Sequence, residues 1–98
     1  MTEVQLTDVV TRARQILSAD TGEEILAIDE KTGNCFSVGG SGRLIWECAA
    51  EPITVAAICA LLRRHYRVDA DTCAAETLTF VRQLVAERML SVEPGAGA

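Results

Sequence analysis

Residues 34–46 read NCFSVGGSGRLIW. They join a short segment in which the side chains alternate in character to a short apolar segment. The segment Cys35–Val38 alternates as a strand does, so Phe36 and Val38 share one face, which we expect to meet the core. Leu44–Trp46 indicates the start of a helix, with Ser41 as its expected N-cap and Trp46 in the core. The intervening GGSG carries no chemistry and predicts a quick turn from strand into helix.

Two further strands are predicted before this stretch. Glu24–Asp29 is rich in branched apolar residues and flanked by charge, as strands often are. Gly33 ends the turn after it and is expected to adopt a positive φ, so that the strand at Cys35 pairs back on it. A first strand is predicted at Val9–Arg14, with a short helical turn as the alternative, and 18–22 is predicted to be a turn.

Three helices are predicted after the GGSG stretch. The first covers Gly42–Ala49, and the second covers Val55–His65 with Thr54 as its cap. The third begins after Asp69 or Asp71 and reaches about Leu90, and 91–98 is expected to be a frayed tail.

The third helix carries two apolar stripes, which is more than one packed face requires. One stripe contains Leu78 and Val85, which are expected to be buried, together with Ala74 and Val81. The adjacent stripe consists of Thr77, Phe80 and Leu84, with Thr77 expected at the border of the core. The second stripe is therefore available for a partner.

Strands followed by helices indicate an α+β fold, here a three-stranded antiparallel sheet followed by three helices. The 98 residues suffice for one domain with a modest core, which we assign to residues 1–92 with a flexible tail at 93–98.

Charge argues against a nucleic-acid partner. The net charge is −5, and although the middle third of the chain carries +2, no long basic stripe exists. Arg63, Arg64 and Arg67 gather at the expected end of the second helix. They either complement the helix dipole or contact an acidic patch of a partner.

No catalytic, metal or cofactor machinery is visible. The four cysteines (Cys35, Cys48, Cys59 and Cys73) are widely spaced and read as reduced, mostly core residues, without the pairing that zinc requires. His65, the single histidine, is expected at a helix end on the surface. No signal peptide or membrane span is visible, so we expect a cytoplasmic protein without cofactors that does not bind membranes.

The segment Cys35–Val38 lacks the charge or proline that usually protects an edge strand. An extended peptide could add to it through backbone hydrogen bonds while its side chains press on the third helix. The sequence therefore predicts a peptide groove between an edge strand and a helix.

The order of these motifs resembles the PqqD-like family. The resemblance rests on Gly33-x-x-Phe36-x-Val38-x-x-x-Gly42-x-x-Ile45-Trp46, on Thr54-Val55-x-x-Ile58-x-x-x-Leu62 and on Phe80-Val81-x-x-Leu84, and spans about residues 24–92. The chain departs from the family pattern at Gly39, where asparagine is common, and at Arg88, where glycine is common.

The resemblance implies a winged-helix-like RiPP recognition element, a domain that binds the leader of a ribosomally synthesised precursor peptide. Such a protein is not an enzyme but presents the leader to a processing enzyme, expected here to be a leader peptidase of lasso-peptide biosynthesis. The alternative within the family is delivery to a radical SAM enzyme, and the alternative of another class is a winged-helix nucleic-acid binder. By resemblance, the peptide would contact Cys35, Phe36, Ser37 and Val38 on the strand, and Thr77, Phe80, Val81 and Leu84 on the helix.

Overall fold

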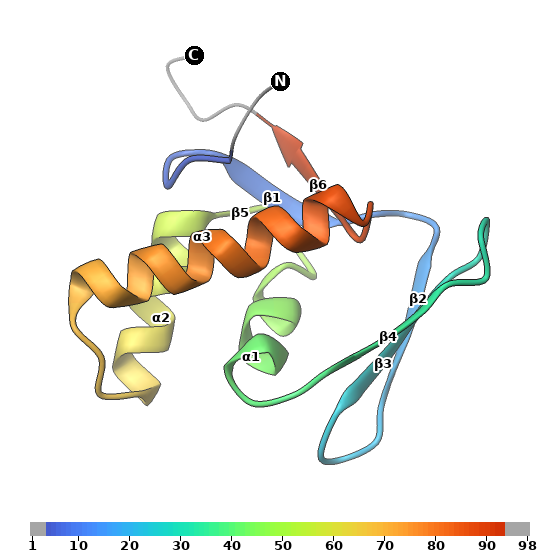
Figure 1. The fold of residues 1–98 in the computed structure, drawn as a ribbon, viewed down its shortest axis with the longest axis horizontal. Helices are drawn as coiled ribbons and strands as arrows, with labels where there is room; N and C mark the ends of the chain where they lie inside the picture. Colours follow the sequence, from blue (N-terminus) through green and yellow to red (C-terminus); the bar gives the residue numbers. More distant parts are fainter. Residues whose placement is uncertain (1–3, 94–98) are drawn as a thin grey trace.

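Two small antiparallel sheets and three helices form the part of the chain that the computed structural model describes, residues 4–93 (Figure 1). In chain order the elements are β1 (Val9–Arg12), β2 (Ile16–Asp20), β3 (Ile25–Asp29), β4 (Cys35–Val38), α1 (Ser41–Cys48), β5 (Ile53–Thr54), α2 (Val55–His65), α3 (Ala70–Ala86) and β6 (Leu90–Glu93). The α+β class and the three-stranded antiparallel sheet followed by three helices are confirmed.

The first sheet has the strand order β2-β3-β4 and projects from the helices as a wing (Figure 1). Its first strand is Ile16–Asp20, so the prediction of a turn at 18–22 was wrong for residues 18–20. Leu17, Leu26 and Ile28 lie exposed on the outer face, whereas Ile25 and Ala27 face the core. Gly33 adopts the expected positive φ (78°) in the turn between β3 and β4.

The second sheet, with the order β5-β1-β6, was not predicted from the sequence. The expected strand at Val9–Arg14 exists as β1, but it pairs with the distant β5 and β6 rather than with β3. Val9 lies opposite Glu93, so β6 occupies residues where a frayed tail was expected from Ser91. Residues 94–98 of the expected tail lie outside the described residues.

Side-chain caps mark the starts of α2 and α3, whereas α1 begins after a glycine. The side chain of Thr54 accepts a hydrogen bond from the backbone N–H of Ala57, and Asp69 does the same for Thr72, so both caps are confirmed. The hydrogen bond from Thr72 also lowers the pKa of Asp69. Ser41 is not a cap, because it is already helical and Gly40 precedes it with a φ of 56°, which favours glycine.

The third helix ends at Ala86 rather than near Leu90, and it closes with a Schellman motif. The N–H of Met89 donates to the carbonyl of Leu84 (2.8 Å), and the N–H of Arg88 donates to that of Val85 (2.9 Å). Arg88 occupies the left-handed position of this motif, with a φ of 63°. An arginine therefore stands where glycine is normally favoured.

We predict that Arg88→Gly stabilises the fold by about 1 kcal/mol, because a left-handed φ is strained for a residue with a Cβ atom. Urea unfolding followed by circular dichroism measures the change. Arg88→Ala is the matched control, since it removes the same side chain but keeps the Cβ atom. An equal gain from both variants would attribute the effect to the side chain instead of the backbone.

One core joins the wing to the helices. Trp46, Ile58, Val81 and Met89 are among its fully buried residues, and the guanidinium of Arg12 lies over the Trp46 ring at 4.9 Å from its centroid. All four cysteines are free thiols, with Cys59 and Cys73 buried, Cys48 half-buried and Cys35 exposed. Within residues 4–93, no helix is long and apolar enough to cross a bilayer.

Candidate functional site

The strand β4 forms one edge of the wing, as predicted, and its hydrogen-bonding pattern can be derived from the turn before it. The N–H of Asp29 donates to the carbonyl of Asn34 (2.9 Å), and the register then pairs Ala27 with Phe36. Hydrogen-bonded and non-bonded pairs alternate in an antiparallel ladder, so Phe36 bonds to β3 as Asn34 does. The backbone N–H and C=O groups of Cys35 and Ser37 therefore point to the open edge.

The side chains of β4 divide as the alternation predicts. Val38 is buried and Phe36 is half-buried against the core, whereas Cys35 and Ser37 are exposed. The hydroxyl of Ser37 donates a hydrogen bond to the carboxylate of Glu24, the residue that precedes the neighbouring strand β3. The edge thus offers backbone groups to a partner, while its outward side chains contribute little.

A hollow of about 540 Å³ opens where β4 ends. The GGSG turn forms one wall of it through Gly39, Ser41 and Gly42. The other walls come from α1, the α2–α3 corner and α3: Ile45, Leu62, Tyr66, Val68, Cys73, Glu76, Thr77 and Phe80. Gly39 directly follows β4, so the hollow begins next to the Val38 end of the strand, and none of the four β4 residues lines it.

Glycine at position 42 fits this wall closely. A Cβ atom there would lie 2.9 Å from the tip of the Phe80 ring. The two helices α1 and α3 thus approach through Gly42 and Phe80, and the ring of Phe80 is held over the start of α1. The GGSG turn therefore depends on two of its glycines. Gly40 allows the positive φ, and Gly42 allows the close contact with Phe80.

A second, shallower hollow of about 300 Å³ runs along α3. It is lined by Ala75, Glu76, Thr79, Phe80 and Gln83. Glu76 and Phe80 line both hollows and therefore form the boundary between them.

The exposed face of α3 differs from the predicted one. Thr77 and Leu84 are each 3% exposed, so two of the three residues in the stripe expected to be free belong to the core, and Val81 of the other stripe is 0% exposed. Leu78 and Val85 are half-buried, as are Ala74 and Phe80. The position of Thr77 at the border of the core was therefore wrong, and among the four helix residues expected to contact a peptide, only Thr77 and Phe80 line a hollow.

Sequence reasoning missed several residues that line the larger hollow. Leu62 and Tyr66 are four residues apart and lie on one side of the α2 end, a spacing that could have indicated a shared face. Glu76 precedes Phe80 by the same spacing on α3. Their meeting at one hollow depends on how α2 and α3 cross, which no local pattern in the chain specifies.

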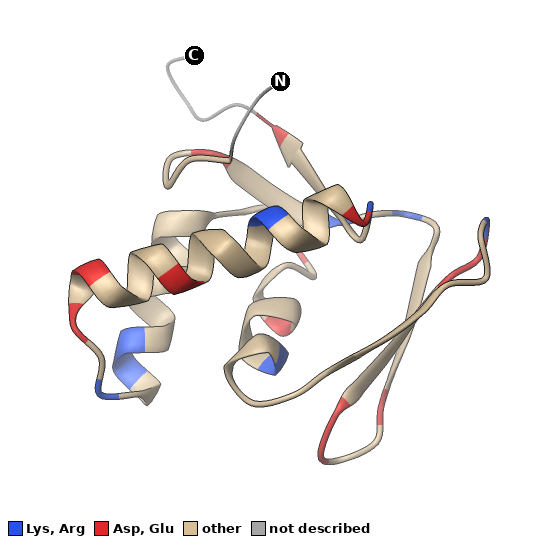
Figure 2. Cartoon of the chain, viewed as in Figure 1, with Lys and Arg blue, Asp and Glu red and all other residues tan. Residues whose placement is uncertain are grey.

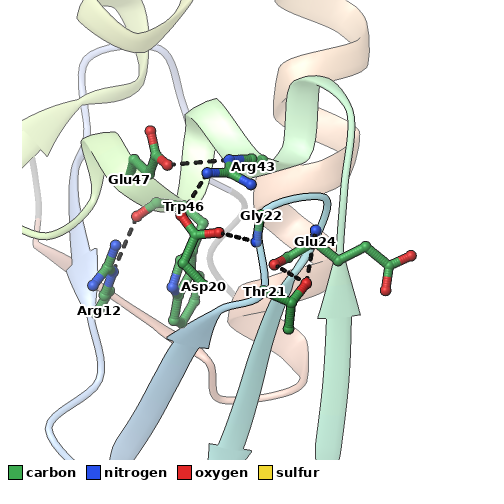
Figure 3. Close-up of polar contacts among 8 residues, drawn as sticks. All are labelled: Arg12, Asp20, Thr21, Gly22, Glu24, Arg43, Trp46 and Glu47. Carbon is green, nitrogen blue, oxygen red and sulfur yellow. Dashed lines mark hydrogen bonds and ion pairs between the residues drawn. The ribbon is translucent and has the colours of Figure 1, made fainter.

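Polar contacts fix the wing to the body (Figure 3). Arg43 on α1 forms an ion pair with Asp20 at the end of β2 and a second one with Glu47 (3.3 Å). Asp20 also accepts a hydrogen bond from the N–H of Gly22, which orders the β2–β3 turn. Of these contacts, the ion pair between Arg43 and Asp20 joins the sheet that contains β4 to α1.

Among the charged residues that the structure describes, whose positions along the chain are shown in Figure 2, only Glu76 lines the two hollows described here. Arg63, Arg64 and Arg67 are exposed at the α2–α3 corner, and both ion pairs recorded within residues 4–93 involve Arg43 instead. In the same range, no group of three or more histidine, cysteine, aspartate or glutamate side chains is placed to hold a metal ion. The arrangement suits the binding of an extended, largely apolar chain.

Comparisons with known proteins agree with this geometry. The profile of the family described as coenzyme PQQ synthesis protein D (PqqD) matches residues 24–90. Among solved structures, TbiB1 in complex with the TbiA(beta) leader peptide has a similar fold, with a TM-score of 0.79 and 23% sequence identity. The similarity covers 83% of this chain and 94% of TbiB1. A comparison with curated proteins found no match.

Proposed function

Because the chain belongs to the PqqD family, we propose that it binds the leader segment of a ribosomally synthesised precursor peptide and presents it to a processing enzyme. The observation that carries this proposal is the open edge of β4, which ends at an apolar hollow beside α3. The solved complex of the similarly folded TbiB1 contains a leader peptide, which supports the same class of ligand for this chain.

Strand addition gives the complex its register. The outward N–H and C=O groups of Cys35 and Ser37 are spaced to pair with alternate residues of an added strand. In an antiparallel arrangement, the N-terminal part of the leader lies at the Val38 end and therefore beside the large hollow. Its C-terminal part leaves past Cys35, near the β3–β4 turn.

Side chains of the leader would supply specificity. Alternate residues of an added strand share a face, so every second side chain of the leader points toward α3. An apolar side chain suits the large hollow, where Thr77 and Phe80 contribute to the wall. Val81 and Leu84 support this wall from within the core.

The protein would act by presentation and not by catalysis. We propose a leader peptidase of lasso-peptide biosynthesis as the recipient enzyme, with delivery to a radical SAM enzyme as the alternative. Reconstitution separates the two: the precursor is incubated with each candidate enzyme, with and without this protein. Stimulated leader cleavage supports the first recipient, and a stimulated modification of the intact precursor supports the second.

The binding proposal is tested by titrating the ¹⁵N-labelled protein with synthetic leader segments of candidate precursor peptides encoded in the same genome. We expect the largest amide shifts at Cys35, Ser37 and the residues lining the large hollow. A duplex DNA fragment serves as the competing ligand, because a nucleic-acid binder is the alternative class. Shifts with DNA alone, or leader shifts confined to other surfaces, would contradict the proposal.

A further inference from the structure

One charged side chain stands in the groove. Among the described residues that line the two hollows, all are apolar or uncharged except Glu76. Glu76 lies on the boundary between the hollows, next to Phe80, and is itself exposed. Any peptide that lies along α3 from one hollow to the other must pass this carboxylate.

The Glu76 side chain is in none of the ion pairs of the described residues. The ion pairs recorded within residues 4–93 join Arg43 to Asp20 and to Glu47, and no hydrogen bond to the Glu76 side chain is recorded there. A peptide that covers an unpaired carboxylate with apolar groups loses affinity, because the charge is partly removed from water without compensation. A cationic group at the same place recovers that loss.

We infer that Glu76 selects leader peptides with a lysine or arginine in the strand-forming segment. The inference rests on the proposed function and specifies its ligand. The cationic residue lies two positions from the apolar residue that fills the large hollow, because residues two apart on a strand share a face and are separated by about 7 Å. Its ammonium or guanidinium group then pairs with the Glu76 carboxylate while its methylene groups cover Phe80.

The surrounding charges make this pairing specific to one site. Arg63, Arg64 and Arg67 are exposed and adjoin in sequence the residues Leu62, Tyr66 and Val68 that line the large hollow, so they would repel a second cationic residue of the leader there. Asp69 and Asp71 start α3 but line neither hollow. A single cationic position is therefore expected in the bound segment, and not a basic run.

The test is calorimetry with the synthetic leader that shifts the β4 amides in the titration described above. Glu76→Gln is expected to weaken binding about three- to fivefold at low salt, and the difference should shrink as salt rises. Glu87→Gln is the matched control. It removes one negative charge at the C-cap of the same helix, and Glu87 lines neither hollow. It should change the affinity less than twofold.

A charge exchange gives the sharper result. Glu76→Lys is expected to weaken binding of the natural leader about tenfold or more. A leader in which the single lysine or arginine of the bound segment is replaced by glutamate should restore much of that loss with Glu76→Lys, while binding the unmodified protein poorly.

The outcomes separate this inference from the proposed function. If the leader shifts the amides of β4 but binds Glu76→Gln and Glu76→Lys as tightly as the unmodified protein, the binding function stands and the selection by Glu76 is wrong. A bound leader without any lysine or arginine in the protected segment overturns the inference equally. If no leader binds, both fail together.

Discussion

Ser37→Pro is expected to reduce leader affinity by at least about tenfold while leaving the protein folded. The N–H of residue 37 points to the open edge of β4, so proline removes a donor to the peptide but none of the bonds to β3. The pyrrolidine ring also occupies space on the edge where the leader must approach. The combined loss is on the order of 1.4–3 kcal/mol.

Ser37→Ala is the control for this variant. It loses the hydrogen bond from the serine hydroxyl to Glu24 but retains the backbone N–H, so its affinity should remain near that of the unmodified protein. Calorimetry measures the affinity and circular dichroism checks the fold. Normal binding by a folded Ser37→Pro protein would show that the leader does not add to β4.

Thr77→Glu is expected to destabilise the whole domain by about 3–5 kcal/mol. Thr77 is 3% exposed, and its hydroxyl lies beside the thiol of Cys73 (3.8 Å between oxygen and sulfur) within the packed face of α3. A carboxylate there would be an uncompensated charge in the core. A domain of this size has about 5–15 kcal/mol of total stability, so a large unfolded fraction is expected.

Thr79→Glu makes the same chemical change two residues away on the exposed side of the same helix. Its stability should stay within about 0.5 kcal/mol of the unmodified protein. Urea unfolding compares the two variants directly. Equal stabilities would mean that residue 77 faces solvent, contrary to its burial in the structure, and would make it a surface position as its sequence pattern suggested.

The local features of the fold were readable from the sequence. Strands at Glu24–Asp29 and Cys35–Val38, the caps Thr54 and Asp69 and the positive φ of Gly33 each depend on a few neighbouring residues, and each was found. The open edge followed from the absence of charge and proline in β4. Signals of this kind lie within one turn or one strand.

The errors concern contacts between distant segments. Pairing of β1 with β5 and β6 has no local signature, so Val9–Arg12 was assigned to the wrong sheet. On α3, hydrophobicity alone placed Leu78 and Val85 in the core and Thr77 at its border, but the crossing with α2 buries Cys73, Thr77 and Val81 most deeply. A small residue such as threonine fits where helices approach closely, and the apolar pattern of α3 alone does not say which of its two stripes lies there.

The pairing of β1 with β6 also sets an order in which the domain can be completed during synthesis. The hairpins of β2, β3 and β4 join neighbouring segments and can form while the rest of the chain is still on the ribosome. β1 must wait until Leu90–Glu93 has left the exit tunnel, because β6 pairs along its whole length. A nascent chain therefore exposes the β4 edge before α3 has been synthesised and can cover its side of the groove.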